Sequence, residues 1–583
     1  MKTKVFVLLL AFTLVATFAF ARGEKEAASG AAATSAAAAT GEPQYGGTLT
    51  AFRAPGQQNT DPPTPSRMAS ATSAPHFWRQ PFQEMPLVGD FEKYGPRGTG
   101  EFAFQVRGYI PEQYMKGQLL ESWEVNPDKI IWHVRKGIYW HGNKPKVMQS
   151  RELVADDLTQ WVEYRRKDPA GKYIRQAIDS PRTIDKYTLE IPFARGYDFL
   201  IMYLIGYEDR CEVEPPETVA AGDDQWENQV GTGPFMNTEY VVGSYFKYEK
   251  NPNYYEKTTI NGKEYQTPFV DELVYPILPD ESTQIAALRT GKLDWYGQVP
   301  APQWSVLDTQ TPDIKSARVV AANGFVLALR VDKPPYDNIK VRHALMIGTD
   351  MNAFNAILGS GIDLPIDWHP LYPGDPATYV PMDKLPAESR ALYDYNPAKA
   401  KQMLKEAGVP DGFRMEVVTE PYPMAQERAS LLAAQWSKIG VTVDVRVSDE
   451  TTYVGFRYDK NFKDSLITTV ETPSPVFLLQ RTAYTDATLN PAHYSDPEMD
   501  ATIDKMVTTL DLGERNRLAT QAGLKLLYDC PYVPLQCTAE AYFWWPWIKN
   551  YYGEFNVQDA GQPVPLFACM WLDQDLKAKM GFK

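Results

Sequence analysis

The most regular alternation of hydrophobic and polar positions lies between residues 396 and 447. Apolar residues recur at helical spacing from 400 to 407, after Asn-Pro and before Gly, which predicts a capped helix. A strand at Met415–Thr419 follows, and then a helix with Trp436 on its apolar face. Val441–Val447 alternates valine with polar residues, as a strand does. This strand–helix–strand order predicts parallel strands in a right-handed crossover, with Trp436 in the core.

A second clear pattern predicts a β-hairpin. Met236–Val242 and Tyr245–Lys250 are aromatic and β-branched runs on either side of Gly243-Ser244. A two-residue Gly-X loop suits a type II′ turn, whose twist matches that of the strands. Gly231 and Gly233 precede the hairpin and permit backbone angles or close approaches that other residues cannot adopt. We therefore expect a tight, rigid turn that leads into the hairpin.

Similar patterns along the chain predict an α/β protein. With 583 residues the chain is too long for one core, so two or three domains are expected. The other predicted strands are Leu49–Arg53, Ile130–Val134, Ile138–Trp140, Thr188–Phe193, Asp271–Leu278 and Phe325–Arg330. The other predicted helices run from Asp156 or Asp157 to Arg165, over Ser282–Arg289, and over Val341–Leu358 with Asn338 as cap.

The N-terminus has the pattern of a secretory signal peptide. Lys2 and Lys4 precede the apolar run Val5–Phe20, and a small-x-small site ends at Ala21. A membrane anchor is the alternative, but this apolar run is short for a membrane span. The first cysteine is Cys211, so no lipid-anchored form is expected. The sequence predicts export, cleavage after Ala21, and a protein in the periplasm.

Composition excludes some partners. Residues 22–44 are rich in Ala, Gly, Ser and Thr, which predicts a disordered linker. Without its first 21 residues, which hold two lysines and no acids, the chain keeps 57 of 59 basic residues and all 73 acids. Its net charge then falls from −14 to −16, which argues against nucleic acid or anionic lipid as a partner.

The sequence nominates no catalytic or metal centre. It has no Gly-x-Ser-x-Gly elbow, no complete phosphate loop, no His-Glu-x-x-His and no Cys-x-x-Cys. His133 and His141 flank a turn and could approach each other, but a metal site there has little support. Cys530 and Cys537 are close enough to bridge, although the pairing of the four cysteines stays open. No cofactor and no metal are expected.

Short motifs in a fixed order carry a resemblance to a known family. They are Tyr45-Gly46-Gly47-Thr48-Leu49, Leu120–Glu124, Val134–Gly137 with His141-Gly142, Ala155–Asp157, Val230–Phe235 with Asn251–Tyr255, Ala287-Leu288 with Gly291–Asp294, Val341–Leu345, Asn396 to Gly408, and Gln435 to Val441. Together they resemble the family 5 extracellular solute-binding proteins, the oligopeptide-binding class of bacterial ABC importers. The likeness runs from about Tyr45 to Asp529.

The resemblance implies an α/β, two-lobed periplasmic binding protein fold (class II-like), with an additional third domain and a ligand cleft between the lobes. Residues 45–65, 188–322 and 530–583 would form the first lobe, and 66–187 the extra domain attached to it. Residues 323–529 would form the second lobe. The two lobes would close on the ligand, which binds at their interface.

The resemblance also implies where a ligand binds. The candidate ligand-binding residues are Phe77, Trp78, Thr232, Trp368, Tyr453, Thr469 and Glu471. Peptide-binding members have an aspartate that pairs with the ligand's ammonium group, and Glu471 is the nearby carboxylate here, with Thr469 and Val470 as alternative positions. Glu471 would anchor an amine if it faces the cleft, and would be an ordinary loop acid if it faces solvent.

The aromatic content of 13% adds a second ligand class. Most of these rings belong in a core, but a few flat ones could bind a sugar or a peptide side chain. The run Phe543–Trp547 is expected mainly to pack. The sequence therefore predicts a monomeric binding protein, not an enzyme, that passes a peptide or an oligosaccharide to the transmembrane subunits of an ABC permease. A secreted hydrolase and a sensory binding protein for a membrane receptor are the alternatives.

Overall fold

A computed structural model describes residues 41–53, 74–105, 110–168, 171–208, 211–223, 225–358, 371, 375, 377–471, 474–558 and 564–582. The predicted signal peptide, most of the predicted linker, and Trp368 lie outside these residues. Within the described residues, no helix combines the length and the apolar character that crossing a membrane requires.

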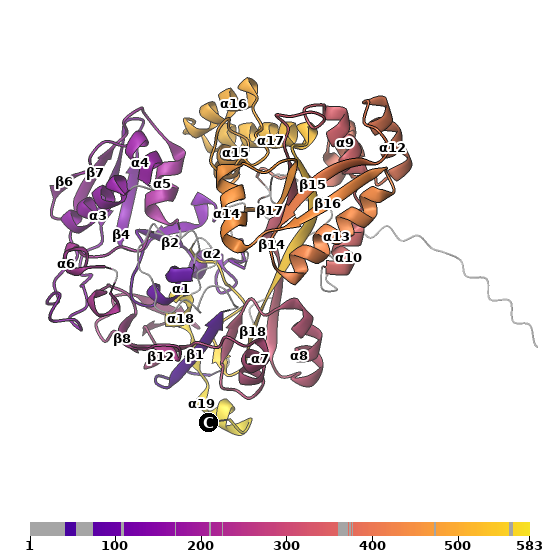
Figure 1. Ribbon diagram of the computed structural model, residues 1–583. Helices are drawn as coiled ribbons and strands as arrows, with labels where there is room; N and C mark the ends of the chain where they lie inside the picture. Colours follow the sequence, from indigo (N-terminus) through magenta and orange to yellow (C-terminus); the bar gives the residue numbers. More distant parts are fainter. Residues whose placement is uncertain are drawn as a thin grey trace, which may run out of the picture.

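One ten-stranded sheet runs through the molecule (Figure 1). Its order is β16-β15-β17-β14-β18-β13-β1-β12-β9-β8. The strands are β1 (Thr48–Arg53), β8 (Phe235–Val241), β9 (Tyr245–Lys250), β12 (Glu272–Pro276), β13 (Trp295–Gly297), β14 (Lys315–Leu329), β15 (Phe413–Thr419), β16 (Val441–Val447), β17 (Ser465–Glu471) and β18 (Tyr532–Trp544). The strands from β13 to β8 lie in the first lobe, and those from β16 to β17 lie in the second.

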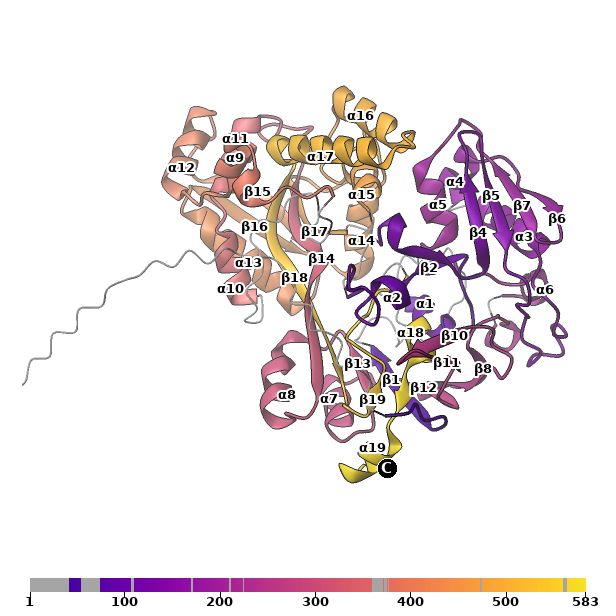
Figure 2. The ribbon, with the colours of Figure 1, turned by 180° about the vertical axis from the view of Figure 1, so that it is seen from behind.

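Two long antiparallel strands connect the lobes. β14 and β18 pair from Lys315 and Trp544 in the first lobe to Ala328 and Tyr532 in the second (Figure 2). Their register shifts twice, between Val320 and Gly324 and between Phe325 and Val326. The connection between the lobes is therefore a two-stranded ribbon that is irregular near its middle.

A four-stranded antiparallel sheet forms a side domain beside the first lobe (Figure 1). Its strands are β4 (Leu120–Val125), β5 (Lys129–Val134), β6 (Arg182–Asp185) and β7 (Thr188–Pro192). α3 (Ala155–Lys167) has Val154 at its N-cap position, so neither Asp156 nor Asp157 is the N-cap that was predicted; Asp157 lies in the first turn and accepts a hydrogen bond from the Val154 amide (3.0 Å). β7 pairs with β5 and β6, and the predicted domain boundary before residue 188 therefore falls inside this sheet.

The remaining elements cover these sheets. The helices are α1 (Ala74–Arg79), α2 (Phe91–Tyr94), α4 (Lys172–Ala177), α5 (Phe199–Gly206), α6 (Pro216–Ala221), α7 (Glu281–Arg289), α8 (Trp304–Gln310), α9 (Ile339–Ile347), α10 (Met351–Leu358), α11 (Ala387–Arg390), α12 (Pro397–Glu406), α13 (Pro423–Ser437), α14 (Glu450–Asp459), α15 (Pro475–Thr482), α16 (Pro497–Val507), α17 (Leu512–Asp529), α18 (Val564–Cys569) and α19 (Gln574–Lys579). The short strands are β2 (Leu87–Gly89), β3 (Met115–Gly117), β10 (Lys257–Ile260), β11 (Lys263–Gln266), β19 (Ile548–Lys549) and β20 (Trp571–Leu572).

The structure confirms the unit predicted from residues 396–447. Asn396 accepts a hydrogen bond from the Lys399 amide (2.9 Å), and Pro397 is the first residue of α12. β15 and β16, which α13 connects in the chain, pair with each other in parallel. Trp436 is fully buried, and its indole Nε1 donates to Thr349 Oγ1 (3.0 Å). Hydrophobic periodicity alone was enough to place these elements.

The predicted helix over Val341–Leu358 is two helices, α9 and α10, separated at Gly348–Asp350. The end of α13 causes this break. The Asp350 amide donates to the Gln435 side chain (2.7 Å), and Asp350 then accepts from the Ala353 amide (3.1 Å) at the start of α10. Gln435 lies 85 residues away in sequence, so its contact has no local signal, whereas Gly348 at the end of α9 and the cap at Asp350 are local features that the prediction passed over.

The predicted hairpin forms, but its loop has three residues. Val241 pairs with Tyr245, and the Ser244 amide donates to the Val241 carbonyl (2.9 Å). Gly243 has a φ of +67° and so takes the left-handed position of this loop. The register of the hairpin also shifts between Asn237 and Glu239, where Thr238 is an extra residue on β8.

The four cysteines are buried thiols. Cys530 packs in the cluster on the α9 and α13 side of the second lobe, whereas Cys537 packs in the cluster on the α15 to α17 side. The suggested bridge between them does not form, because the sheet separates the two side chains. Burial raises the pKa of the Cys530 and Cys569 thiols to about 12.

Candidate ligand-binding site

The Gly231-Thr232-Gly233 turn is packed against the segment that contains Phe82. A Cβ atom on Gly231 would lie 1.6 Å from the Phe82 carbonyl oxygen, and one on Gly233 would lie 2.9 Å from the carbonyl carbon. The Gly233 amide donates to the same Phe82 oxygen (3.0 Å), and the His141 amide donates to the Gly231 carbonyl (2.9 Å). Close backbone approach is therefore the reason for both glycines.

Glu84 is the buried polar centre behind this turn. Its carboxyl group accepts hydrogen bonds from Thr232 Oγ1 (2.8 Å), Tyr254 Oη (2.9 Å) and Tyr255 Oη (3.0 Å). Burial, together with the nearby charge of Glu256, raises the pKa of Glu84 to about 7. Thr232 is itself buried, so its hydroxyl group holds the turn in place.

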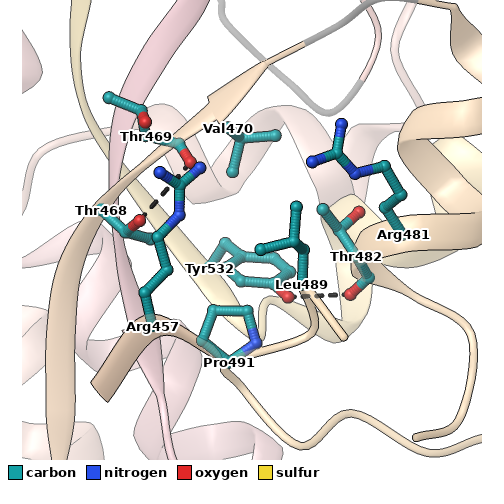
Figure 3. Close-up of a pocket in the computed structure, with 9 residues that line it drawn as sticks. All are labelled: Arg457, Thr468, Thr469, Val470, Arg481, Thr482, Leu489, Pro491 and Tyr532. Atoms are coloured by element: carbon teal, nitrogen blue, oxygen red, sulfur yellow. Dashed lines mark hydrogen bonds between the residues drawn. The ribbon is translucent and has the colours of Figure 1, made fainter. Parts of the chain in front are cut away.

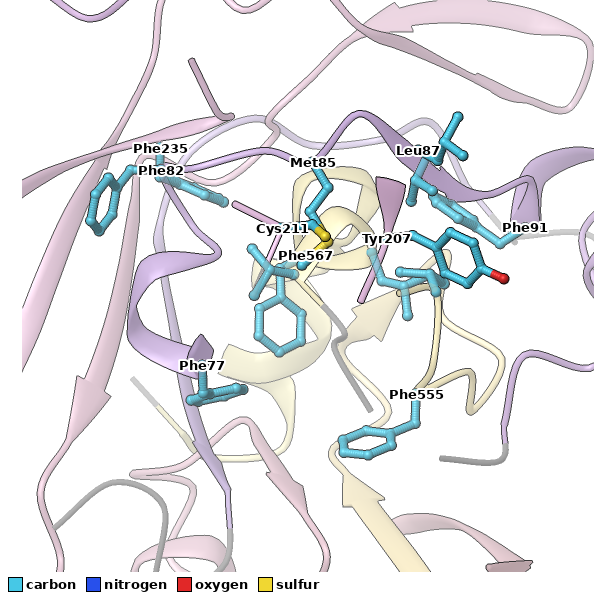
Figure 4. Close-up of a cluster of buried hydrophobic side chains, with 14 of the residues drawn as sticks. Phe77, Phe82, Met85, Leu87, Phe91, Tyr207, Cys211, Phe235, Phe555 and Phe567 are labelled. Carbon is cyan, nitrogen blue, oxygen red and sulfur yellow. The ribbon is translucent and has the colours of Figure 1, made fainter. Parts of the chain in front are cut away.

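Phe77 and Trp78 belong to the core of the first lobe. Phe77 stacks on Tyr275 with ring centroids 4.4 Å apart, and Trp78 lies parallel to Phe246 at 5.9 Å (Figure 4 shows Phe77 in this cluster). Both side chains are at most 4% exposed. The tryptophans of the Phe543–Trp547 run are buried in the same cluster, in agreement with the packing role expected for them.

The pocket that the structure reveals lies in the second lobe. It is a hollow, open to solvent, between β17, α14, α15 and the start of β18 (Figure 3). Its lining residues are Arg457, Thr468, Thr469, Val470, Arg481, Thr482, Leu489, Pro491 and Tyr532. β15, β16 and β17 are parallel, and α14 and α15 follow the carboxyl ends of β16 and β17. Pockets in α/β sheets commonly form at this edge.

Local contacts fix the walls of the pocket. Tyr453 Oη donates to the Ile467 carbonyl (2.9 Å) and so holds α14 against β17. Ser474 accepts from the Phe477 amide (3.0 Å) and caps the start of α15. Tyr532 Oη donates to the Thr482 carbonyl (2.8 Å), which joins the end of α15 to β18. The pocket is therefore formed by elements that are tied to one another.

An apolar recess adjoins the pocket. It is narrow, and it shares Val470, Thr482 and Tyr532 with the pocket. Its other lining residues are Leu478, Leu526, Leu527 and Pro534. The combined space has a polar part near the two arginines and an apolar part beneath α15.

The pocket is on the side of the second lobe that faces the rest of the molecule. α14 and α15 lie opposite α2 and α5 in both ribbon views (Figures 1 and 2). The Phe477 ring of α15 is 5.1 Å from the Tyr203 ring of α5. Arg515 of α17 pairs with Glu112 (3.2 Å) and lies over the Phe199 ring at 3.9 Å. The two parts of the molecule therefore meet beside the pocket.

The structure brings only part of the predicted site together. Thr469 lines the pocket, and Tyr453 supports it from behind. Glu471 is the last residue of β17, and its side chain, like that of Trp368, is outside what the structure describes. Phe77, Trp78 and Thr232 are in the core of the first lobe. The sequence did not single out Arg457, Arg481 or Tyr532.

His133 and His141, which flank a turn in the sequence, have separate partners in the structure. His141 is buried, with Nε2 3.0 Å from the Gly233 carbonyl, and burial lowers its pKa to about 4. His133 lies 3.2 Å from Glu124 instead. Among the residues with described coordinates, no group of three or more His, Cys, Asp and Glu side chains could hold a metal ion.

Comparisons with known proteins agree with this architecture. The family model for bacterial extracellular solute-binding proteins, family 5, matches residues 115–485. Heme-binding protein A of Haemophilus influenzae is 26% identical over 72% of this chain and 78% of its own length. The dipeptide-binding protein of Escherichia coli is 28% identical over 59% of this chain and 65% of its own length.

A solved structure has the same two-lobed periplasmic binding fold. The periplasmic binding protein DppA from Helicobacter pylori, in complex with the peptide STSA, superposes with a TM-score of 0.69. The match covers 91% of this chain and 99% of that protein, at 20% identity. The fold predicted from the sequence motifs is confirmed.

Proposed function

This chain belongs to the family 5 bacterial extracellular solute-binding proteins, and from this premise we propose that it binds a small solute between its lobes and delivers it to an ABC permease. The observation that supports the proposal most directly is the pocket at the Thr469 end of β17, which faces α5 of the other part of the molecule. Binding sites at domain interfaces are typical of proteins that close on their ligands.

A peptide is the ligand class that we favour. The Escherichia coli relative is named as a dipeptide-binding protein, and the Helicobacter pylori structure contains a peptide. An oligosaccharide is the alternative. The sequence suggests Glu471 as the anchor for a ligand amine. If Glu471 binds that amine, Glu471→Gln weakens peptide binding.

The protein acts by binding and release without chemical change to the solute. We further propose that the chain is exported to the periplasm and cleaved after Ala21. There it acts as a monomer that contacts the permease subunits. A hydrolase on the same scaffold would convert the trapped solute, and a sensory protein would pass its signal to a receptor instead of a permease.

The proposal is tested by titration calorimetry of the mature chain against mixed di- and tripeptides and against neutral oligosaccharides. We expect saturable heat with peptides, and recovery of the peptide intact by mass spectrometry. Small-angle X-ray scattering should show a smaller radius of gyration in the complex, since the lobes close. Saturation only with sugars would replace the peptide assignment, and release of cleaved peptide would replace the binding function by hydrolysis.

A further inference from the structure

The helix α5, which follows the sheet of the side domain, is apolar along its whole length. Its sequence is Phe-Leu-Ile-Met-Tyr-Leu-Ile-Gly, and every residue except Leu204 is buried. Its last turn is bound to the side domain, because Arg165 of α3 donates to the Leu204 carbonyl (2.7 Å). Its start is bound there too, because Tyr173 of α4 donates to Asp198 (2.9 Å), the N-cap of α5. A helix that is apolar on all sides needs packing partners on all sides.

The second lobe covers one face of α5. Phe199 and Leu200 pack in a cluster with residues of β14, α15, α16 and α17, and both are at most 3% exposed. α5 lies opposite α15 in both ribbon views (Figures 1 and 2). The other face packs in the cluster of the first lobe and the side domain, through Ile201, Met202, Tyr203 and Ile205. If the lobes moved apart, Phe199 and Leu200 would therefore become exposed to water.

Arg515 of α17 adds polar contacts at the same place. Its guanidinium group lies over the Phe199 ring at 3.9 Å and donates to Tyr197 Oη (3.1 Å) and to the Glu112 carboxylate (3.2 Å). It also donates to the Thr509 carbonyl of its own lobe (3.3 Å). Arg515 is only 2% exposed, so these groups replace the water around its charge. Three of these four contacts cross from the second lobe to the other part of the molecule.

These contacts lie beside the pocket and not in it. Phe199, Leu200 and Arg515 are not among the residues that line the pocket. All the groups that make the contacts belong to the chain itself. The contacts therefore form whenever the lobes come together, with or without a solute.

We propose that Glu112, Tyr197, Phe199, Leu200 and Arg515 form an interlobe clasp that stabilises the closed arrangement of the lobes in the absence of ligand. Burial of the apolar face and the charge-assisted hydrogen bonds of Arg515 both favour it. The ligand-free chain is then a mixture of open and closed forms, and the clasp raises the closed fraction. Arg515 is a positioning residue that holds the lobes together without touching the solute. This inference goes beyond the proposed function, because it concerns the chain before any solute binds.

The first test measures the radius of gyration of the ligand-free mature chain by small-angle X-ray scattering. One variant, Arg515→Gln, changes the second lobe, and a double variant, Glu112→Gln with Tyr197→Phe, changes the other side of the clasp. Loss of a charge-assisted contact changes an equilibrium about tenfold, so each variant should lower the ratio of closed to open form about tenfold and have a larger radius of gyration than wild type. The triple variant should expand little further, because both sets of changes remove the same contacts.

Arg517→Gln is the matched control. Arg517 lies two residues further along α17 and pairs with Glu514 of the same helix, so this variant should keep the wild-type radius of gyration. A role of Arg515 within its own lobe would lower the thermal stability of Arg515→Gln, but it would not expand the folded chain. Such a role would also leave the double variant unchanged. Expansion of both variants therefore identifies a contact between the lobes.

The second test measures affinity by titration calorimetry with the mixed di- and tripeptides or the neutral oligosaccharides, whichever bind the wild type. Both clasp variants should bind about tenfold more weakly, because a smaller fraction of the chain is closed before binding. At saturation their radius of gyration should equal that of the wild-type complex, since the ligand then holds the lobes together.

The outcomes separate the clasp from the proposed function. If both ligand-free variants keep the wild-type radius of gyration, the clasp is wrong, while binding of a probe still supports the proposed function. If no probe binds the wild type and both variants expand, the clasp stands and the proposed function fails. If Arg515→Gln does not fold, the double variant decides, because the Glu112 side chain is 41% exposed and Tyr197→Phe keeps the ring.

Discussion

The turn at Gly231 in the first lobe and the pocket at Thr469 in the second lobe are opposites in construction. The turn is fully buried and is held by backbone contacts to Phe82 and by a hydroxyl bond to Glu84. The pocket is open to solvent and is lined by side chains from five separate segments. The turn is packed too closely to admit a ligand, whereas the pocket is open and has two arginine side chains in its lining.

This difference shows that a short sequence motif identifies closely packed structure more readily than it identifies a binding pocket. Glycines that are required by close packing form a compact pattern in sequence, because consecutive residues make the contact. A pocket collects single residues from distant segments, and each of them looks ordinary in its own segment. Changes at the turn should therefore affect the stability of the protein, and changes at the pocket should affect its affinity.

The largest effect is expected for Gly231→Ala. The added Cβ would lie 1.6 Å from the Phe82 carbonyl oxygen, and only backbone movement can relieve that clash. We expect a loss of at least about 3 kcal/mol in the free energy of unfolding, measured by denaturant titration. The control is Gly455→Ala in α14, where the nearest atom is 3.8 Å away, and which should be neutral or slightly stabilising. Equal stability of the two variants would contradict the packing role of the turn.

A smaller effect is expected from the protonation of Glu84. Its folded pKa is raised to about 7 from an ordinary 4.5, so the folded state keeps a proton that the unfolded state loses between these values. The contribution of Glu84 to stability is therefore highest below about pH 4.5 and declines as the pH rises to about 7, by up to about 3 kcal/mol.

Glu84→Gln isolates this contribution. As the pH rises from 5 to 7.5, the wild type should lose stability relative to Glu84→Gln, because Glu84 becomes charged in the unfolded state whereas Gln stays neutral. Denaturant unfolding at several pH values measures it. A difference that is constant with pH would mean that the carboxyl group is ionised throughout and that its hydrogen bonds outweigh its burial.

Tyr453→Phe should have a moderate effect on stability. The variant loses the hydrogen bond from Tyr453 Oη to the Ile467 carbonyl and keeps the ring, so we expect a loss of about 1 kcal/mol. Tyr528→Phe is the control, since this side chain is 40% exposed, and its change should be near zero. If Tyr453→Phe lowers affinity tenfold with no change in stability, Tyr453 contacts the ligand instead of supporting the wall.

The smallest effect on stability is expected for Thr469→Val. The side chain is half-buried in the pocket, and valine keeps its shape, so the unfolding free energy should change by less than about 0.5 kcal/mol. Binding of a free-acid peptide should weaken about three- to tenfold if the hydroxyl contacts the ligand. Titration calorimetry, with the exposed Thr451→Val as control, measures this. A large loss of stability would show that Thr469 is part of the structural core.

The sequence predicts those parts of the molecule that depend on local pattern. The capped α12 and the parallel pair of β15 and β16 follow from spacing alone. The break at Gly348–Asp350 was missed although Gly348 ends α9 and Asp350 accepts from the Ala353 amide; only the contact to Gln435 on another helix has no local signal. The register shift between Asn237 and Glu239 in the hairpin is marked by no residue type.

The arginines of the pocket were missed for a related physical reason. Arg457 and Arg481 each lie in the last turn of a helix, where a basic residue is expected because it favours the negative end of the helix dipole. In sequence both therefore look like ordinary helix ends. Only the packing of α14 and α15 around β17 brings the two charges to one space. The motif at Thr469 indicates β17, which lines the pocket, but it gives no sign of the two arginines beside it.

The burial of the four thiols has a consequence for how this protein matures. Cys530 and Cys537 are on opposite sides of a sheet, and burial raises the pKa of Cys530 and Cys569 to about 12, so almost no reactive thiolate is present at neutral pH. The described fold therefore holds together without a disulfide bond, and neither an oxidant nor a disulfide isomerase is needed to form it.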